Sequence, residues 1–268
     1  MKLRAIALNT FGLFLRDKLL IVFASLFLCV LLLMMTPLLT LKGRITASNM
    51  EGMQAYVLQL VSMIMYMVSG MGSLLAAWAA ADAVHTEMKS GTVLAVMARP
   101  VKRWEFLLGK YLGVLLLMVF YVVAMAGLSF ALAWMGGQKL QSALWILFVY
   151  PMVRYAIYAA LAMLVATVAH PVITWALTLL LGVLATMVVP GPDEPTNWAL
   201  RWLKTALYHV LPSTHFLSED RFLIIKHASL RQTAWGEHAI TLLYGLDYAL
   251  VLLLLAMWSF HYRSLKRD

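Results

Sequence analysis

Charged residues are scarce in this sequence. Of its 268 residues, only 12% are Asp, Glu, Lys or Arg, whereas 63% are hydrophobic. A soluble domain has about 25% charged residues and about half apolar ones, so the composition excludes an ordinary soluble domain. Several apolar runs reach about 20 residues, the length that crosses the hydrocarbon core of a bilayer. The composition therefore predicts a multi-pass membrane protein.

The sequence has one cysteine and no nucleotide-binding loop. The only cysteine is Cys29, so no disulfide can form within the chain. The only Gly-Lys pair, Gly109-Lys110, has Trp104 where a phosphate-binding loop needs a glycine and Tyr111 where it needs Ser or Thr. ATP, if it is used, must therefore be hydrolysed by a separate chain.

Metal-binding and catalytic motifs are also missing. None of the seven histidines stands in a His-Glu-x-x-His pattern, and there is no Gly-x-Ser-x-Gly elbow. We predict no catalytic residue, no metal site and no cofactor bound by this chain. The net charge of +9 need not indicate a nucleic-acid partner, because basic residues on one side of a membrane orient its spans.

The apolar runs predict an all-α integral membrane protein that forms a single transmembrane domain over residues 1–268. Proline at Pro171, directly after His170, separates the fourth span from the fifth. One kinked helix is the alternative, although it would be longer than a bilayer is thick. The six predicted transmembrane helices lie near residues 19–41, 60–81, 111–135, 143–169, 172–190 and 239–260.

Three further segments are predicted outside the spans. Apolar residues recur at helical spacing over about residues 3–16, which predicts a helix in the membrane interface rather than a flank with no structure of its own. Residues 82–110 form a polar segment between two spans. Residues 191–238 form an outer cap between helices five and six, which contains a predicted amphipathic helix from Trp198 to Leu211, ended by Pro212.

The lysines and arginines predict the orientation of the chain. Twelve of them lie on the side that holds both termini and residues 82–110, and eight lie on the other side. Because short basic segments near spans stay in the cytoplasm, both termini and residues 82–110 are predicted to be cytoplasmic, in a plasma (inner) membrane.

Residues 82–110 carry the most informative pattern. Ser90-Gly91-Thr92 is typical of a helix start, and Pro100 ends the element at Arg99. A short helix with apolar Val93, Val96 and Met97 and charged flanks suits a groove on another protein. An ordinary loop is the alternative.

The residues that follow adjoin the third span. Lys102 and Arg103 are placed to meet lipid phosphates, and Trp104 suits the headgroup region. Gly109 and Gly113 form a small-xxx-small face, which permits another helix to approach closely.

This segment also carries a family resemblance. The patterns Glu87-x-x-x-Gly91-Thr92 and Arg99-Pro100-Val101-x-Arg103-Trp104, followed by Gly109-Lys110, resemble those of ABC exporter permeases of the type-two (ABC-2-like) membrane family. The resemblance implies a transmembrane subunit that pairs with itself or with a homologous permease, contacts membrane lipids and binds a cytoplasmic ABC ATPase holding ATP and magnesium. The implied coupling residues are Glu87, Gly91, Thr92, Val93, Val96, Met97, Arg99, Pro100, Lys102 and Arg103.

Two charges lie within the predicted spans. Arg154 falls in the fourth span and Asp247 in the sixth, both in the outer half. Because charges in lipid are costly and find partners, we predict that Arg154 pairs with Asp247, directly or through a polar cavity. The alternative for Arg154 is that its side chain snorkels to the interface.

Two other functions fit parts of the sequence. Methionines are numerous around the second span, and thioethers bind soft metals, so a permease of a cofactor or metalloenzyme maturation system is one alternative. Methionine more often fills irregular packing. An integral-membrane lipid-modifying enzyme is the alternative from another class, and it would need clustered carboxylates or histidines at one membrane face.

Overall fold

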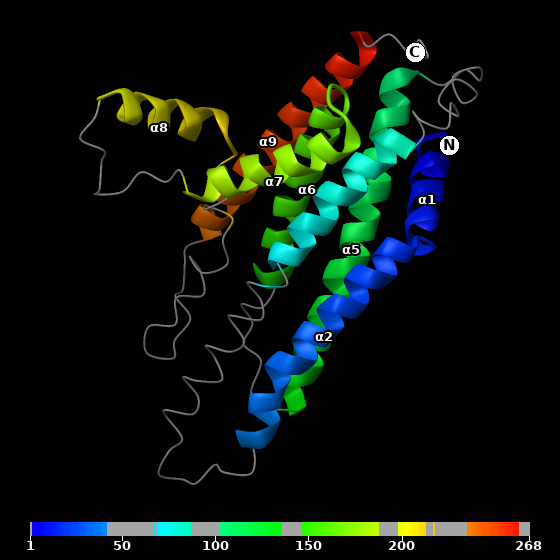
Figure 1. Ribbon diagram of the computed structural model, residues 1–268, viewed down its shortest axis with the longest axis vertical. Helices are drawn as coiled ribbons and strands as arrows, with labels where there is room; N and C mark the ends of the chain where they lie inside the picture. Colours follow the sequence, from blue (N-terminus) through cyan, green and yellow to red (C-terminus); the bar gives the residue numbers. More distant parts are fainter. Residues whose placement is uncertain are drawn as a thin grey trace.

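The regular structure of this chain is helical wherever the structure describes it. The computed structural model describes residues 2–41, 67, 69–86, 102–135, 146–187, 198–212, 217 and 235–262. One helix covers residues 69–86 and is drawn in cyan in Figure 1. The others are α1 (Lys2–Leu15), α2 (Lys18–Leu41), α5 (Arg103–Met135), α6 (Ile146–Ala166), α7 (Pro171–Met187), α8 (Trp198–Val210) and α9 (Trp235–Tyr262).

Three helices among the described residues are long and apolar enough to cross a membrane. They are Arg103–Met125 of α5, Val149–Ala166 of α6 and Gly236–Tyr262 of α9. Pro171–Ala185 of α7 is apolar but shorter. These helices agree with the predicted all-α membrane fold, and the count of six spans stays a prediction.

The helices form an elongated bundle whose two chain ends lie together. In Figure 1, α1 begins and α9 ends at the same end of the bundle, which we call the terminal end. Helix α5 starts there, and α6 returns to it and turns back into α7. Helix α8 projects sideways from the bundle, on the side where α7 ends and α9 begins (Figure 1).

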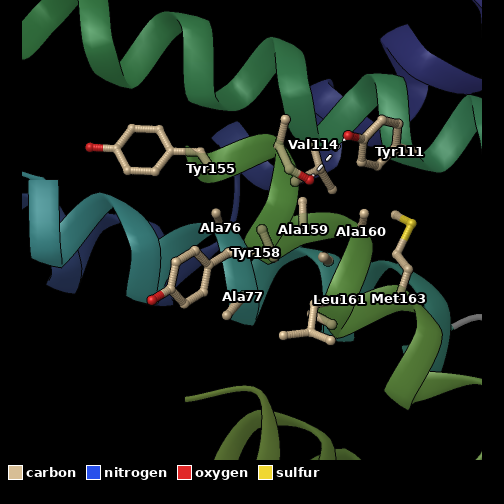
Figure 2. Packing of buried hydrophobic residues seen from close by; sticks show 14 of the residues in the cluster. Ala76, Ala77, Tyr111, Val114, Tyr155, Tyr158, Ala159, Ala160, Leu161 and Met163 are labelled. Carbon is tan, nitrogen blue, oxygen red and sulfur yellow. Dashed lines mark hydrogen bonds between the residues drawn. The ribbon is translucent and has the colours of Figure 1, made fainter. Parts of the chain in front are cut away.

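Helix α6 lies at the centre of the bundle and packs against α5, α7 and α9. About 72% of the apolar stretch of α6 is buried, whereas about 28% of the apolar stretch of α9 is buried. Helix α9 therefore presents far more surface to its surroundings. The α6 core is built from small residues. Ala159 and Ala160 of α6 belong to the same buried cluster as Ala76 and Ala77 of the 69–86 helix (Figure 2). Alanines permit this close approach of the helices.

Tyrosines fill the remaining space around α6. The hydroxyl of Tyr111 on α5 donates a hydrogen bond to the carbonyl of Ala156 at 3.1 Å (Figure 2). Two further rings lie where only a glycine leaves room: a Cβ on Gly72 would be 2.2 Å from the Tyr155 ring, and one on Gly182 would be 2.4 Å from the Tyr158 ring. These contacts fix α6 against its neighbours.

Helices α6 and α9 run parallel with a constant register. A Cβ on Gly245 would be 2.4 Å from Val153 Cγ1, and Ser259 Oγ lies 2.8 Å from Thr167 Oγ1. Both pairs are separated by the same 92 positions in the sequence, so each residue of α6 lies level with the residue 92 positions later in α9. This register gives the relative depth of residues in the two helices.

Several element boundaries differ from those that hydrophobicity indicates. The helix after the second predicted span continues through Thr86, and α5 begins at Arg103 rather than at Tyr111, so both ends of the predicted 82–110 segment are helical. The two-helix interpretation at His170-Pro171 holds: α6 ends at Ala166 and α7 starts at Pro171. Pro171 starts α7 without losing a bonded amide, since the first helical N–H has no partner within the helix.

Candidate functional site

The centre of the predicted coupling segment, residues 87–101, lies outside the described residues. The structure describes the two flanks of that segment, which are the end of the 69–86 helix and the start of α5. The predicted residues that fall outside are Glu87, Gly91, Thr92, Val93, Val96, Met97, Arg99 and Pro100.

The first flank is held against α7. His85 is buried, and its Nε2 lies 3.1 Å from Oγ1 of Thr174, a residue with no exposed surface. One residue later, the Thr86 hydroxyl donates to Oδ1 of Asp82 at 2.8 Å, which closes the last turn with a side-chain bond. The helix therefore arrives at the coupling segment with its end fixed to α7.

The second flank is held against α9. The backbone N–H of Lys102 donates to Oε2 of Glu105 at 3.0 Å, which supplies a partner for one amide at the start of α5. Nη1 of Arg103 donates to the carbonyl of His261 at 2.8 Å. A cation suits this position because the last carbonyls of a helix lack partners and carry partial negative charge. Lys102, by contrast, is exposed.

A stacked aromatic pair lies directly behind this second flank. Phe106 of α5 and Phe260 of α9 stack with their ring centroids 6.1 Å apart, and both are buried. Nζ of Lys110 lies 5.7 Å from the centroid of Phe106, and Lys110 is only 3% exposed. The sequence places Lys110 among the cytoplasmic basic residues, whereas the structure places it inside the bundle.

The predicted small-residue face on α5 packs against α1. A Cβ on Gly109 would lie 2.7 Å from Cγ2 of Ile6, and a Cβ on Gly113 would lie 2.6 Å from Cβ of Thr10. From the first contact to the second, α5 advances four residues, from Gly109 to Gly113, and α1 advances four residues, from Ile6 to Thr10. The two helices therefore run parallel across this contact. Helix α1 is therefore packed along the first turns of α5, beside the second flank of the coupling segment.

The terminal end is thus one connected unit among the described residues. Hydrogen bonds join the 69–86 helix to α7, α5 to α9, and α6 to α9 through Thr167 and Ser259. Close packing joins α5 to α1, and it joins α6 to the 69–86 helix and to α7. A displacement of residues 87–101 would act on both flanks and, through these contacts, on every helix in this unit.

Comparison with known protein families identifies the chain. The profile of the ABC-2 family of transporter proteins matches residues 4–265, which is nearly the whole sequence. The chain belongs to the ABC-2 family of transporter membrane proteins. It is accordingly a multi-pass membrane protein, as its apolar helices also indicate. No curated protein is similar enough in sequence to give a significant match.

The structure places the two predicted intramembrane charges of this ABC-2 protein at the same level. By the register of α6 and α9, Arg154 is level with Leu246, one residue before Asp247. Nη1 of Arg154 donates to Oγ of Ser69 at 2.7 Å, and its Nη2 donates to the carbonyl of Leu217 at 2.6 Å. The guanidinium thus joins α6 to the 69–86 helix and to Leu217, which lies between α8 and α9 in the sequence.

Asp247 is exposed on α9 and lies on a different face of that helix from the one that meets α6. Gly245 contacts Val153 and Leu217, and two further residues rotate a helix by about 200°. The pairing of Arg154 with Asp247 stays a prediction, and two acceptors of the Arg154 guanidinium are a hydroxyl and a backbone carbonyl.

The described part of this ABC-2 protein contains no group of three or more His, Cys, Asp or Glu residues that could hold a metal ion. The chemically notable groups that sequence reasoning missed are His85, Lys110 and the carbonyl of His261. His85 and the carbonyl of His261 meet partners on helices distant in the sequence, so no spacing rule could identify them. Lys110 meets Phe106 four residues earlier on α5, a spacing that the sequence does contain.

The bond between His85 and Thr174 gives a first prediction. Thr174→Val removes the hydroxyl with almost no change in shape and leaves His85 Nε2 buried beside an apolar group, which should lower stability by about 1–3 kcal/mol. Thermal unfolding of the purified protein in detergent measures the loss. Thr205→Val, which removes an exposed hydroxyl bonded to Arg201 within α8, is the matched control. Equal unfolding temperatures for the two variants would show that the His85 contact contributes nothing.

Proposed function

We propose that this chain is the transmembrane subunit of an ATP-driven ABC exporter. It pairs as a dimer with a second copy or a homologous permease, and a separate cytoplasmic ATPase supplies ATP binding and hydrolysis with magnesium. The dimer moves its substrate out of the cytoplasm or the inner leaflet by alternating access. Membership of the ABC-2 family supports the transporter role, and the lack of a phosphate-binding loop in the sequence supports a separate ATPase.

The observation that carries this proposal is the anchoring of both flanks of residues 87–101. His85 ties one flank to α7, and Arg103 ties the other to α9. A helix seated in the ATPase at this position would transmit a rigid displacement into the bundle, because packed helices move between discrete arrangements rather than deforming continuously. In this proposal the terminal end is cytoplasmic, which agrees with the distribution of basic residues.

The length of α5 supports the same orientation. Its 33 residues extend for about 50 Å, whereas the hydrocarbon core is about 30 Å thick. The first turns of α5 therefore extend beyond the core if its apolar remainder spans it. Helix α1 packs along those first turns, which suits the interfacial position predicted for it.

Co-purification with the ATPase tests the proposal. Val93→Asp with Met97→Asp places two charges on the predicted apolar face of the coupling helix, so we expect at least about a tenfold loss of ATPase recovered with the tagged chain, since burying an unpaired carboxylate in a groove costs more than 1.4 kcal/mol. Lys102→Gln is the control, because it changes an exposed residue at the edge of the segment, and it should retain the complex.

The measurement should compare complexes purified at equal membrane expression of the tagged chain. A tight complex that persists in the Val93→Asp, Met97→Asp variant would contradict docking through this face. Labelling of residues 87–101 from outside intact cells would contradict the cytoplasmic orientation.

A further inference from the structure

Asp247 lies on an exposed apolar stripe of α9. The residues around it on the helix surface, one turn before and one or two turns after, are Leu243, Leu250 and Leu254, and each is more than half exposed. Asp247 itself is exposed as well. It follows the first residue of α9 by 12 positions and precedes the last by 15, so it is about 18 Å from one end and about 22 Å from the other.

The register of α6 and α9 places this carboxylate at membrane depth. Arg154, level with Leu246, lies eight residues after the start of α6 and 12 before its end. Helix α6 is about 32 Å long and so just spans the hydrocarbon core. Asp247 is therefore about 12 Å from the nearer boundary. A carboxylate at this depth on an apolar surface is costly, and such residues face a polar partner or a transport path rather than lipid tails.

Two tyrosines adjoin the carboxylate. Tyr244 is one turn before Asp247 on the same side of α9, and Tyr248 follows it directly. Their ring centroids are 6.1 Å apart, and the Tyr248 hydroxyl donates to the carbonyl of Val210 at the end of α8, which holds that ring in place. Aromatic faces and a carboxylate together are the groups that attract an organic cation.

We propose that Asp247, Tyr244 and Tyr248 form a binding site for an amphiphilic organic cation that enters from the membrane. The positive group meets the carboxylate and the tyrosine rings, and the apolar body lies along Leu243, Leu250 and Leu254. This inference rests on the proposed function only in treating the ligand as a transported substrate. The site defines a chemical class: one delocalised or alkylated positive charge on a hydrophobic body.

Other occupants fit the same surface less well. A lipid chain provides nothing for the carboxylate. A second copy packed symmetrically on this stripe would bring the two Asp247 carboxylates towards each other, and like charges repel strongly away from water. A bare metal ion needs several oxygen ligands, and no metal-binding group exists among the described residues.

Binding of tetraphenylphosphonium to the purified full-length chain in nanodiscs of uncharged lipid tests the site. Tetraphenylborate has nearly the same size and shape with the opposite charge, so it controls for partition into lipid. We expect saturable binding of tetraphenylphosphonium alone. Asp247→Asn should weaken it about tenfold or more, and Asp247→Glu less than about threefold, because only the former removes the charge.

Glu237→Gln is the matched control, since it neutralises another exposed carboxylate near the start of α9 and should leave binding unchanged. Tyr244→Leu should weaken binding severalfold by removing one ring. Unchanged affinity in Asp247→Asn, equal saturable binding of tetraphenylborate, or absence of saturable binding would each overturn the proposal. A shift from dimer to monomer in Asp247→Asn, measured by native mass spectrometry, with cation affinity unaltered would assign the stripe to subunit contact instead.

The measurement uses the permease without its ATPase, so the two proposals fail separately. Loss of cation binding would leave ATPase co-purification untouched, and failure of co-purification would leave the cation site intact.

Discussion

Gly113→Leu is expected to separate α1 from α5 and to give one of the largest losses of stability in this protein. Even the first added carbon would lie 2.6 Å from Cβ of Thr10 and 2.9 Å from the carbonyl oxygen of Ala7. The Ala7 oxygen is a backbone atom in the middle of α1, so it cannot move without the whole helix. Overpacking of this kind costs about 1–3 kcal/mol and more where the backbone must shift. Thermal unfolding in detergent and the yield of folded protein measure the effect.

Gly127→Leu is the control in the same helix, because a Cβ there meets nothing within 4 Å. Gly109→Ala should fall between the two variants. Its added carbon would lie 2.7 Å from Cγ2 and 2.8 Å from Cβ of Ile6, so α1 must shift slightly, but no backbone atom of α1 is among its three nearest contacts. If Gly113→Leu unfolded at the same temperature as Gly127→Leu, the packing of α1 along α5 would be contradicted.

The contact between α1 and α5 was predictable only in part from the sequence. The spacing of Gly109 and Gly113 predicts that some helix approaches α5 closely, because small residues four apart leave a groove on one face. The pattern contains no information about which helix fills the groove. Ile6 and Thr10 have ordinary side chains, and their role follows only from the parallel register of α1 and α5.

The apolar interiors of the helices were predictable, whereas their polar ends were not. Hydrophobicity indicates the spans because lipid exposure selects apolar residues over about 20 positions. It fails at Asp82–Thr86 and at Arg103–Lys110, where the helices continue through charged sequence. There the backbone is supported by the Thr86–Asp82 bond, the Glu105 cap and burial of Lys110 against Phe106. Such supports depend on side-chain contacts that a hydropathy pattern does not register.

The treatment of Arg154 shows a second limit. Sequence reasoning matches an intramembrane cation with an acid, and it predicts that Arg154 and Asp247 both lie in the outer half of the membrane. The structure, however, shows Arg154 donating to the hydroxyl of Ser69 and to the backbone carbonyl of Leu217. Hydroxyls and carbonyls are present throughout the chain, so charge alone cannot select them. The orientation of Asp247 around α9 is likewise set by where Gly245 meets Val153.

Arg154→Ala is expected to release the segment around Leu217, between α8 and α9, from the bundle. The change removes two charge-assisted hydrogen bonds and leaves the carbonyl of the fully buried Leu217 without this donor. Hydrogen bonds to charged groups contribute about 1.5–3 kcal/mol each, so the loss should be about 3 kcal/mol even where the two are not additive. Thermal unfolding measures the total loss, and faster proteolysis between residues 198 and 217 would locate it in this segment.

Conservative variants separate the geometry of Arg154 from its charge. Arg154→Lys keeps the charge but offers one compact ammonium in place of a planar fork, so it should not serve Ser69 and Leu217 together and should recover only part of the loss. Arg201→Ala, at an exposed position on α8, is the control and should have little effect.

Arg154→Asp combined with Asp247→Arg tests whether Arg154 is held by Asp247 or by Ser69 and Leu217. Recovery of stability in the swapped variant would demonstrate the ion pair predicted from sequence, whereas continued instability is expected if Arg154 acts through Ser69 and Leu217, because an aspartate at position 154 cannot donate to either.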